Sequence, residues 1–145
     1  MYSDRELLAR LIECEAGGEG REGMMAVAGV VMNRVEVVSG EYARIGQRSI
    51  RNIIFQPGQF VCASETENGR YNPQNIYNMN PQQIHYDIAD MAIAGTRLAD
   101  FGQALWFYNP FSKACRQTFP SEVGYFFTKL GKHCFYNPTD LYFFT

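Results

Sequence analysis

One carboxyl group lies on the apolar face of the first predicted helix. Leu8, Leu11, Ile12 and Glu15 follow one another at the i, i+3, i+4 and i+7 spacing of a single helix face. A carboxyl group that faces a protein core loses contact with water, which raises its pKa and suits a general acid near neutral pH. A structural carboxylate that caps the next helix or pairs with Arg34 explains the same pattern. Both interpretations stay open on the pattern alone.

Two other kinds of catalytic site have less support in the sequence. A cysteine hydrolase could combine Cys62 with His133 or His85, but the FVCAS run around Cys62 is strand-like and has no cysteine-protease signature. A zinc amidase would need more ligands than two histidines supply, and there is no HExxH motif. We therefore expect no metal ion and no other cofactor. His85 and Glu13 are expected on helix surfaces.

The cysteines bear on the redox compartment of the protein and do not indicate a metal site. Cys14, Cys62, Cys115 and Cys134 form no CxxC pair and show no metal-like spacing. The N-terminal sequence MYSDRELLAR contains acidic residues and no apolar segment before a small-residue cleavage site, so it does not predict a secretory signal. In a protein that is not exported, reduced thiols are expected in preference to disulfides.

Helices are expected to position Glu15. An S-x-x-E capping box at Ser3 opens the first helix, and a Gly-Gly pair follows its last turn. A second helix is predicted from Glu22 to about Val38, and its apolar residues on all sides indicate a central helix covered by others. Asn80-Pro81 predicts the start of a third helix that ends near Arg97.

Irregular segments and short strands are expected elsewhere. Ser39–Gln47 is polar and Glu65–Asn80 is rich in amides, Gly and Pro, so both are predicted to be loops. A strand is predicted at Ala104–Tyr108, and a hairpin at Ser121–Thr128 and Lys132–Tyr136. The C-terminal LYFFT is expected to add a strand or a hydrophobic tail. Helices followed by a small antiparallel sheet in the C-terminal half predict an α+β fold.

Length and charge exclude several classes of protein. The 145 residues, 46% of them hydrophobic, suffice for one core, and no Pro/Gly/Ser linker divides the chain, so residues 1–145 are expected to form a single domain. The formal net charge of −2, with dispersed Lys and Arg, gives no support for nucleic-acid binding. The longest apolar run, Met24–Met32, is too short to cross a bilayer.

The segment Glu15–Val35 also carries a recognisable motif: E-A-x-G-E, a glycine, and an apolar helix that ends in N-R-V. It resembles the start of the spore cortex-lytic cell-wall hydrolases of the CwlJ/SleB type. The likeness continues at Ile53–Phe60, Ala104–Pro110 and Gly131–Tyr136, and so covers nearly the whole chain. A compact chain without an additional domain is most similar to the CwlJ type. The resemblance implies one catalytic domain with a lysozyme-like or lytic-transglycosylase-like site.

In this family the first Glu of the motif, which falls on Glu15, is taken as the catalytic acid. The resemblance thus implies degradation of spore cortex peptidoglycan during germination. Outside the Glu13–Glu22 cluster no acidic residue stands out as a desolvated partner, so a single Glu acid/base and a lytic transglycosylase reaction are expected. Muramidase or glucosaminidase cleavage stays open. So do a wall amidase or peptidase and a non-catalytic spore-coat protein that binds glycan or acts as a scaffold.

Further residues are candidates for the same site. Polar side chains in or beside the family segments are expected to support it: Glu19, Arg34, Gln59, Asn109 and His133. Aromatic rings match the apolar C–H face of a pyranose, so three residues are expected to bind sugar: Trp106, Tyr108 and Tyr71.

The resemblance also implies a location. Chains of the CwlJ type are made in the mother-cell cytoplasm without a signal peptide and are deposited on the spore from outside. We therefore expect this protein at the coat and cortex periphery. Without a wall-binding domain, it is expected to need a spore-coat protein to hold it there.

Overall fold

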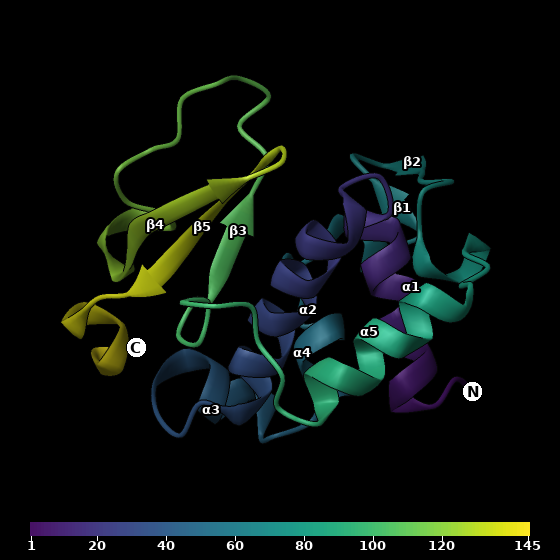
Figure 1. Ribbon diagram of the computed structural model, residues 1–145, viewed down its shortest axis with the longest axis horizontal. Coiled ribbons are helices and arrows are strands. Elements are labelled where there is room, and N and C mark those ends of the chain that lie inside the picture. The colour runs from purple at the N-terminus through teal and green to yellow at the C-terminus, as the bar shows by residue number, and fades with distance from the viewer.

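The computed structural model describes residues 1–145 and has helices on one side and a small sheet on the other (Figure 1). Five α-helices precede the sheet: α1 Asp4–Ala16, α2 Gly20–Glu36, α3 Gly40–Gly46, α4 Ile50–Phe55 and α5 Gln83–Ile93. Short 3-10 helices occupy Val61–Ala63, Ile76–Asn78, Ser121–Val123 and Asp140–Phe144. This arrangement confirms the predicted α+β fold in a single domain.

α1 and α2 form the centre of the molecule. The Ser3 hydroxyl accepts a hydrogen bond from the Glu6 backbone N–H at 3.1 Å and begins α1 as predicted. In α2 every residue from Gly23 to Val35 is buried, as expected for a central helix. α2 begins at Gly20 and ends at Glu36, two residues earlier at each end than predicted.

The sheet contains three antiparallel strands in the order β3-β5-β4: β3 Trp106–Tyr108, β4 Gly124–Leu130 and β5 His133–Pro138. β5 lies in the middle, with Tyr136 opposite both Trp106 and Phe126. The predicted hairpin is therefore confirmed, although it begins at Gly124. Two further short strands, β1 Thr66–Glu67 and β2 Arg70–Tyr71, pair with each other inside the predicted loop.

The last polar residues of α2 connect the helices to the sheet. Asn33 Nδ2 donates to the Ala104 carbonyl at 2.8 Å, and Arg34 Nε donates to the Leu105 carbonyl at 2.7 Å. Both carbonyls lie directly before β3. Because Asn33 and Arg34 are buried, these bonds are shielded from water and fix the start of the sheet against α2.

Two segments differ from their predicted structures because they pack against each other. Residues 39–47 contain α3 rather than a loop. The C-terminal LYFFT is no strand: Asp140–Phe144 form a 3-10 helix that is held on the body through Tyr142, in line with the alternative of a hydrophobic tail. Tyr42 of α3 and Tyr142 near the C-terminus are both buried, and the Tyr142 hydroxyl donates to the Ser39 carbonyl at 3.0 Å. This contact between residues about 100 positions apart stabilises two segments whose local sequences do not predict helix.

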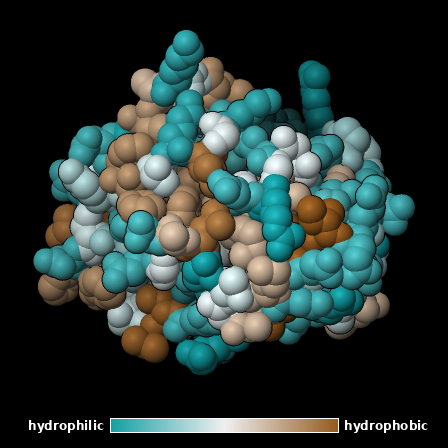
Figure 2. Space-filling model, viewed as in Figure 1, coloured by the Kyte–Doolittle hydropathy of each residue, from teal (hydrophilic) through white to brown (hydrophobic).

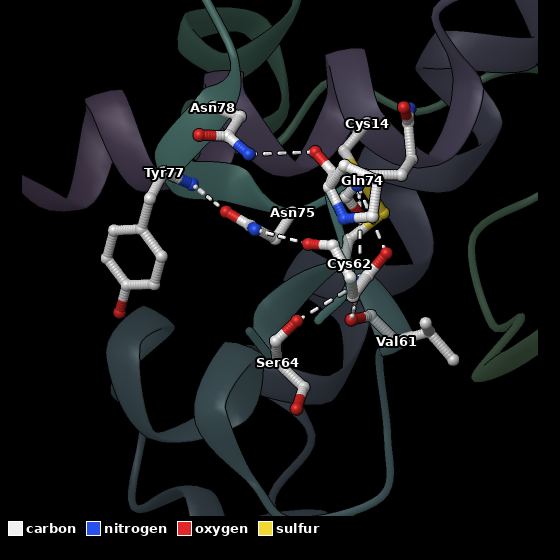
Figure 3. The surroundings of a disulfide bond; sticks show 10 residues. Cys14, Val61, Cys62, Ser64, Gln74, Asn75, Tyr77 and Asn78 are labelled. Atoms are coloured by element: carbon white, nitrogen blue, oxygen red, sulfur yellow. Dashed lines mark hydrogen bonds between the residues drawn. A yellow bond between two sulfur atoms is a disulfide. The ribbon is translucent and has the colours of Figure 1, made fainter. Parts of the chain in front are cut away.

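The expectation of reduced cysteines is wrong. Cys14 is bonded to Cys62 and Cys115 to Cys134, with Cα–Cα distances of 6.2 and 5.9 Å. The first disulfide links the last turn of α1 to the 3-10 helix at residues 61–63, where a strand was expected (Figure 3). Neighbouring amides brace the same region: Asn72 Nδ2 donates to the carbonyls of Val61, Ser64 and Gln74 at 3.0–3.2 Å.

The surface is mixed in character. On the face shown in Figure 2, hydrophilic and hydrophobic residues are interspersed. None of the helices combines the length and the apolarity that a bilayer crossing requires.

Candidate active site

Glu15 lies in an open cleft of about 620 Å³. Three parts of the chain form its walls: the end of α1 with the α1–α2 connection, the start of α5, and the turn between β4 and β5. The polar side chains on these walls, besides Glu15, are Glu13, Glu19, Gln82, His85, Lys132 and His133. Gln74, which follows β2, and Asn109, directly after β3, also line the cleft. The cleft thus brings together Glu15, Glu19, Asn109 and His133 from the predicted site.

The carboxyl group of Glu15 is half-buried, and its pKa is raised to about 7. Burial is the main cause, since it removes water from the charged form. The positive charge of Arg34 and the backbone of Cys62 lower the pKa but do not outweigh burial. A substantial fraction of Glu15 is therefore protonated at neutral pH, as a proton donor must be.

Glu19 holds the turn between β4 and β5 at the edge of the cleft. Its Oε1 accepts from the backbone N–H of Lys132 at 3.1 Å and lies 3.0 Å from Nδ1 of His133. The backbone of Gly131 has φ +59°, and a Cβ there would lie 3.0 Å from Glu19 Oε2, so glycine permits the close approach. The pKa of His133 is lowered: burial lowers it, and the nearby Glu19 raises it by less.

Arg34 lies outside this cleft and does not have the acidic partner that its burial predicted. Its side chain forms no ion pair with Glu15 or Glu19; its hydrogen-bond acceptors are the Leu105 carbonyl at 2.7 Å and Gln59 Oε1 at 3.4 Å. The guanidinium carbon lies 4.6 Å from the ring centre of Tyr42. Burial lowers the pKa of Arg34, while Tyr42, Glu41 and Glu15 raise it. Neutral acceptors and aromatic rings therefore take the place of a carboxylate.

The aromatic residues expected to bind sugar do not line the Glu15 cleft. Trp106 is only 4% exposed and packs edge-on against Tyr142 at 5.5 Å, so it belongs mainly to the core and lies away from the Glu15 cleft. Tyr108 stacks on Phe119 with ring centres 4.4 Å apart. Tyr71 is exposed, but it lies on the β1–β2 hairpin and its hydroxyl accepts from Asn78 Nδ2 at 2.8 Å.

Two cleft residues were expected on helix surfaces. His85 is buried, and its Nδ1 accepts from the Gln82 backbone N–H at 2.9 Å, which caps the start of α5. Glu13 is half-buried, and its Oε1 accepts from the Asn80 backbone N–H at 2.9 Å. The position of His85 in the first turn after Asn80-Pro81 is the one sequence signal for this capping role.

The chain is similar to several known proteins. A family model described as Cell Wall Hydrolase matches residues 18–136. The cell wall hydrolase CwlJ of Oceanobacillus iheyensis is 33% identical, covering 92% of this chain and 86% of its own length; CwlJ of Bacillus subtilis is 28% identical, covering 94% and 87%.

Solved structures show the same fold. The catalytic domain of the germination-specific lytic transglycosylase SleB from Bacillus anthracis aligns with a TM-score of 0.62 and 25% identity, covering 94% of this chain and 97% of that one. The catalytic domain of Bacillus cereus SleB gives a TM-score of 0.63 and 26% identity, covering 94% and 93%. The sequence matches and the shared fold together show that the chain belongs to the cell wall hydrolase family.

Proposed function

We propose that the protein cleaves the glycan strands of spore cortex peptidoglycan during germination, with Glu15 as its single acid/base. The half-buried Glu15 carboxyl group with its pKa near 7, at the edge of an open polar cleft, is the observation that carries this proposal. The name of the SleB relative, a germination-specific lytic transglycosylase, supports the same reaction. The family match begins at residue 18, so the role of Glu15 rests on the geometry of the site.

The proposed reaction uses the Glu15 carboxyl group twice, first as an acid and then as a base. Protonated Glu15 donates its proton to O4, the glycosidic oxygen between C1 of muramic acid and C4 of glucosamine, and the C1–O4 bond breaks. The C6 hydroxyl of the same muramic acid then attacks C1, and the Glu15 carboxylate accepts the proton of that hydroxyl. One strand ends in a 1,6-anhydro ring, the other in a free 4-hydroxyl, and no water is consumed.

The other carboxylates of the cleft support a single-acid mechanism. Glu13 is engaged with the start of α5 through Asn80, and Glu19 with the β4–β5 turn through Lys132. Hydrolysis with two carboxylates requires a second one that is free to act on water or on C1. With both neighbours engaged by backbone N–H groups, the C6 hydroxyl of the substrate is the better nucleophile.

The test compares wild-type protein with Glu15→Gln on isolated cortex sacculi. The variant should lose on the order of a hundred- to ten-thousandfold of the lytic rate, because an amide cannot transfer a proton at neutral pH. Mass spectrometry of the wild-type products should find anhydro ends that are lighter than reducing ends by one water.

Other outcomes would each contradict a defined part of the proposal. Reducing muramic acid ends would mean hydrolysis, and reducing glucosamine ends would mean cleavage of the other bond. Cut stem peptides would indicate an amidase or peptidase. Intact sacculi that retain bound wild-type protein would indicate a glycan-binding or scaffold role.

We further propose that a spore-coat protein holds this enzyme at the cortex periphery. The hydrolase family model covers residues 18–136, and the name of the SleB relative, a germination-specific enzyme, supports action at the spore. A fluorescent fusion should surround the developing spore in wild-type cells and disperse when the coat fails to assemble. A ring of fluorescence that persists without the coat would mean that the protein binds the cortex directly.

A further inference from the structure

We propose that Arg34 forms the floor of a second binding site, which takes a carboxylate group attached to an apolar body. The site is a cavity of about 350 Å³ between α3, the turn that follows α4, β3 and the C-terminal 3-10 helix. It shares no lining residue with the cleft of Glu15. The proposed glycan cleavage places no reacting group in it.

The first argument is a buried charge without a counter-ion. Arg34 is 4% exposed, and no carboxylate lies within ion-pair distance of its guanidinium group. A guanidinium carries five N–H groups. Only two have acceptors, the Leu105 carbonyl and Gln59 Oε1, and both acceptors are neutral. A buried and unpaired charge is costly, so an anion that enters the cavity would form with Arg34 the ion pair that no side chain of the protein forms.

The second argument is the arrangement of donors. Gln59 Oε1 accepts from the Tyr42 hydroxyl at 2.9 Å as well as from Arg34 Nη1 at 3.4 Å. These bonds orient the amide and leave its Nε2 without a protein partner. Arg34 and Gln59 both line the cavity, so planar N–H donors from two side chains are available there. A carboxylate has two acceptor oxygens and suits such donors.

The walls define the rest of the ligand. Five of the twelve lining residues are aromatic, among them Trp106, Phe107 and Phe119, so their rings can contact an apolar part of the ligand behind its carboxylate. Glu41 also lines the cavity. Its charge disfavours a second negative charge on the ligand, which favours a monocarboxylate over a phosphate.

A monocarboxylate of this kind has two sources. One is the terminal carboxylate of a peptide stem on peptidoglycan, and this source rests on the proposed function. The other is a free small carboxylate, which does not depend on it.

The cavity contains its own reporter, because Trp106 is the one tryptophan of the chain. Fluorescence of Trp106 is titrated with N-acetyl-leucine and with N-acetyl-leucinamide, which has the same body but no charge. The acid should give a saturable change, and the amide should bind at least tenfold more weakly. Equal responses to acid and amide, or no saturable response to either, would overturn the proposal.

Two variants test the residues. Arg34→Gln should abolish the preference for the acid; because it alters a buried group, its fold is checked by circular dichroism. Glu41→Gln leaves Arg34 in place and removes a charge that repels the ligand, so it should bind the acid about two- to fivefold more tightly. If Glu41→Gln binds the acid no more tightly than wild type, the carboxylate does not lie in this cavity.

The source is assigned in the Glu15→Gln background, where glycan binding is measured without cleavage. Soluble peptidoglycan fragments with intact stem peptides should displace N-acetyl-leucine if the substrate supplies the carboxylate, and fragments with amidated stems should not. If neither kind displaces the acid, the ligand is a free carboxylate. These titrations need no lytic activity, so their failure is distinct from failure of the proposed glycan cleavage.

Discussion

Glu15 is placed where two effects on one carboxyl group oppose each other. Burial at the end of α1 disfavours its charged form, whereas Arg34 favours it through the protein interior. A direct Glu15–Arg34 ion pair would have kept the carboxyl group ionised. The bonds that hold Arg34 on Leu105 and Gln59 therefore matter for acid catalysis, since they keep the guanidinium from pairing with Glu15.

The raised pKa of Glu15 predicts a pH-dependent stability. The folded protein binds a proton more tightly at Glu15 than the unfolded chain does, with a pKa of about 7 against 4.5. Stability from this group is complete below pH 4.5 and is lost as the pH rises to about 7. The full difference corresponds to about 3 kcal/mol, and partial exposure reduces it to about 1–2 kcal/mol.

Glu15→Gln does not titrate and should escape this loss. Its free energy of unfolding should exceed that of wild type by a margin that grows between pH 4.5 and 7 and is constant above pH 7. Urea unfolding of both proteins at pH 4, 6 and 8 measures the margin. A margin that is the same at all three values would show that Glu15 ionises as easily as it does in water.

For single residues, helix periodicity predicted the environment of a side chain, whereas the residue type alone did not predict its role. The helix spacing that places Glu15 beside Leu11 and Ile12 was sufficient to predict its desolvation. Trp106 was expected in the site because tryptophan stacks on sugars, yet the same large ring also fills a core. Its neighbours Tyr42 and Tyr142 decide between the two roles, and both are more than 30 residues away in the sequence.

Among the elements, those with local signals were predicted and those held by distant contacts were not. α1 and α2 have a cap, a glycine break and clear apolar patterns, and the β4–β5 hairpin has a turn. α3 depends on Tyr142, about 100 residues away, and nothing near Gly40 indicates that contact. The disulfides join positions 48 and 19 residues apart. Spacing alone could not reveal either pair, because the fold brings the cysteines together.

At the scale of the whole molecule, the helices and the sheet meet at opposite ends of β5. At the far end from Glu15, the C-terminal 3-10 helix packs on α3 through Tyr142 and Tyr42 (Figure 1). At the near end, Glu19 bonds the β4–β5 turn to the start of α2. The cleft thus lies between a helical wall and a sheet wall, and Glu19 is the side chain that connects them.

Glu19→Ala should therefore weaken catalysis more than folding. Without the carboxylate the β4–β5 turn is free to move away from α2, and a displacement of about 1 Å at a catalytic cleft can cost one to two orders of magnitude in rate. We expect kcat on cortex fragments to fall on the order of tenfold with a smaller change in KM. The free energy of unfolding should fall by about 1–2 kcal/mol, the cost of one charge-assisted hydrogen bond.

Two matched variants separate this positioning role from simple loss of charge. Glu19→Gln keeps an oxygen that can accept from the Lys132 N–H, so it should recover much of the lost turnover. Glu22→Ala removes the same charge from the exposed first turn of α2 and should leave kcat unchanged. Full turnover in Glu19→Ala would show that the sheet wall keeps its place without this contact. The contacts of Tyr42 with Tyr142, together with the bonds from Asn33 and Arg34 to the residues before β3, would then suffice to hold the two walls of the cleft together.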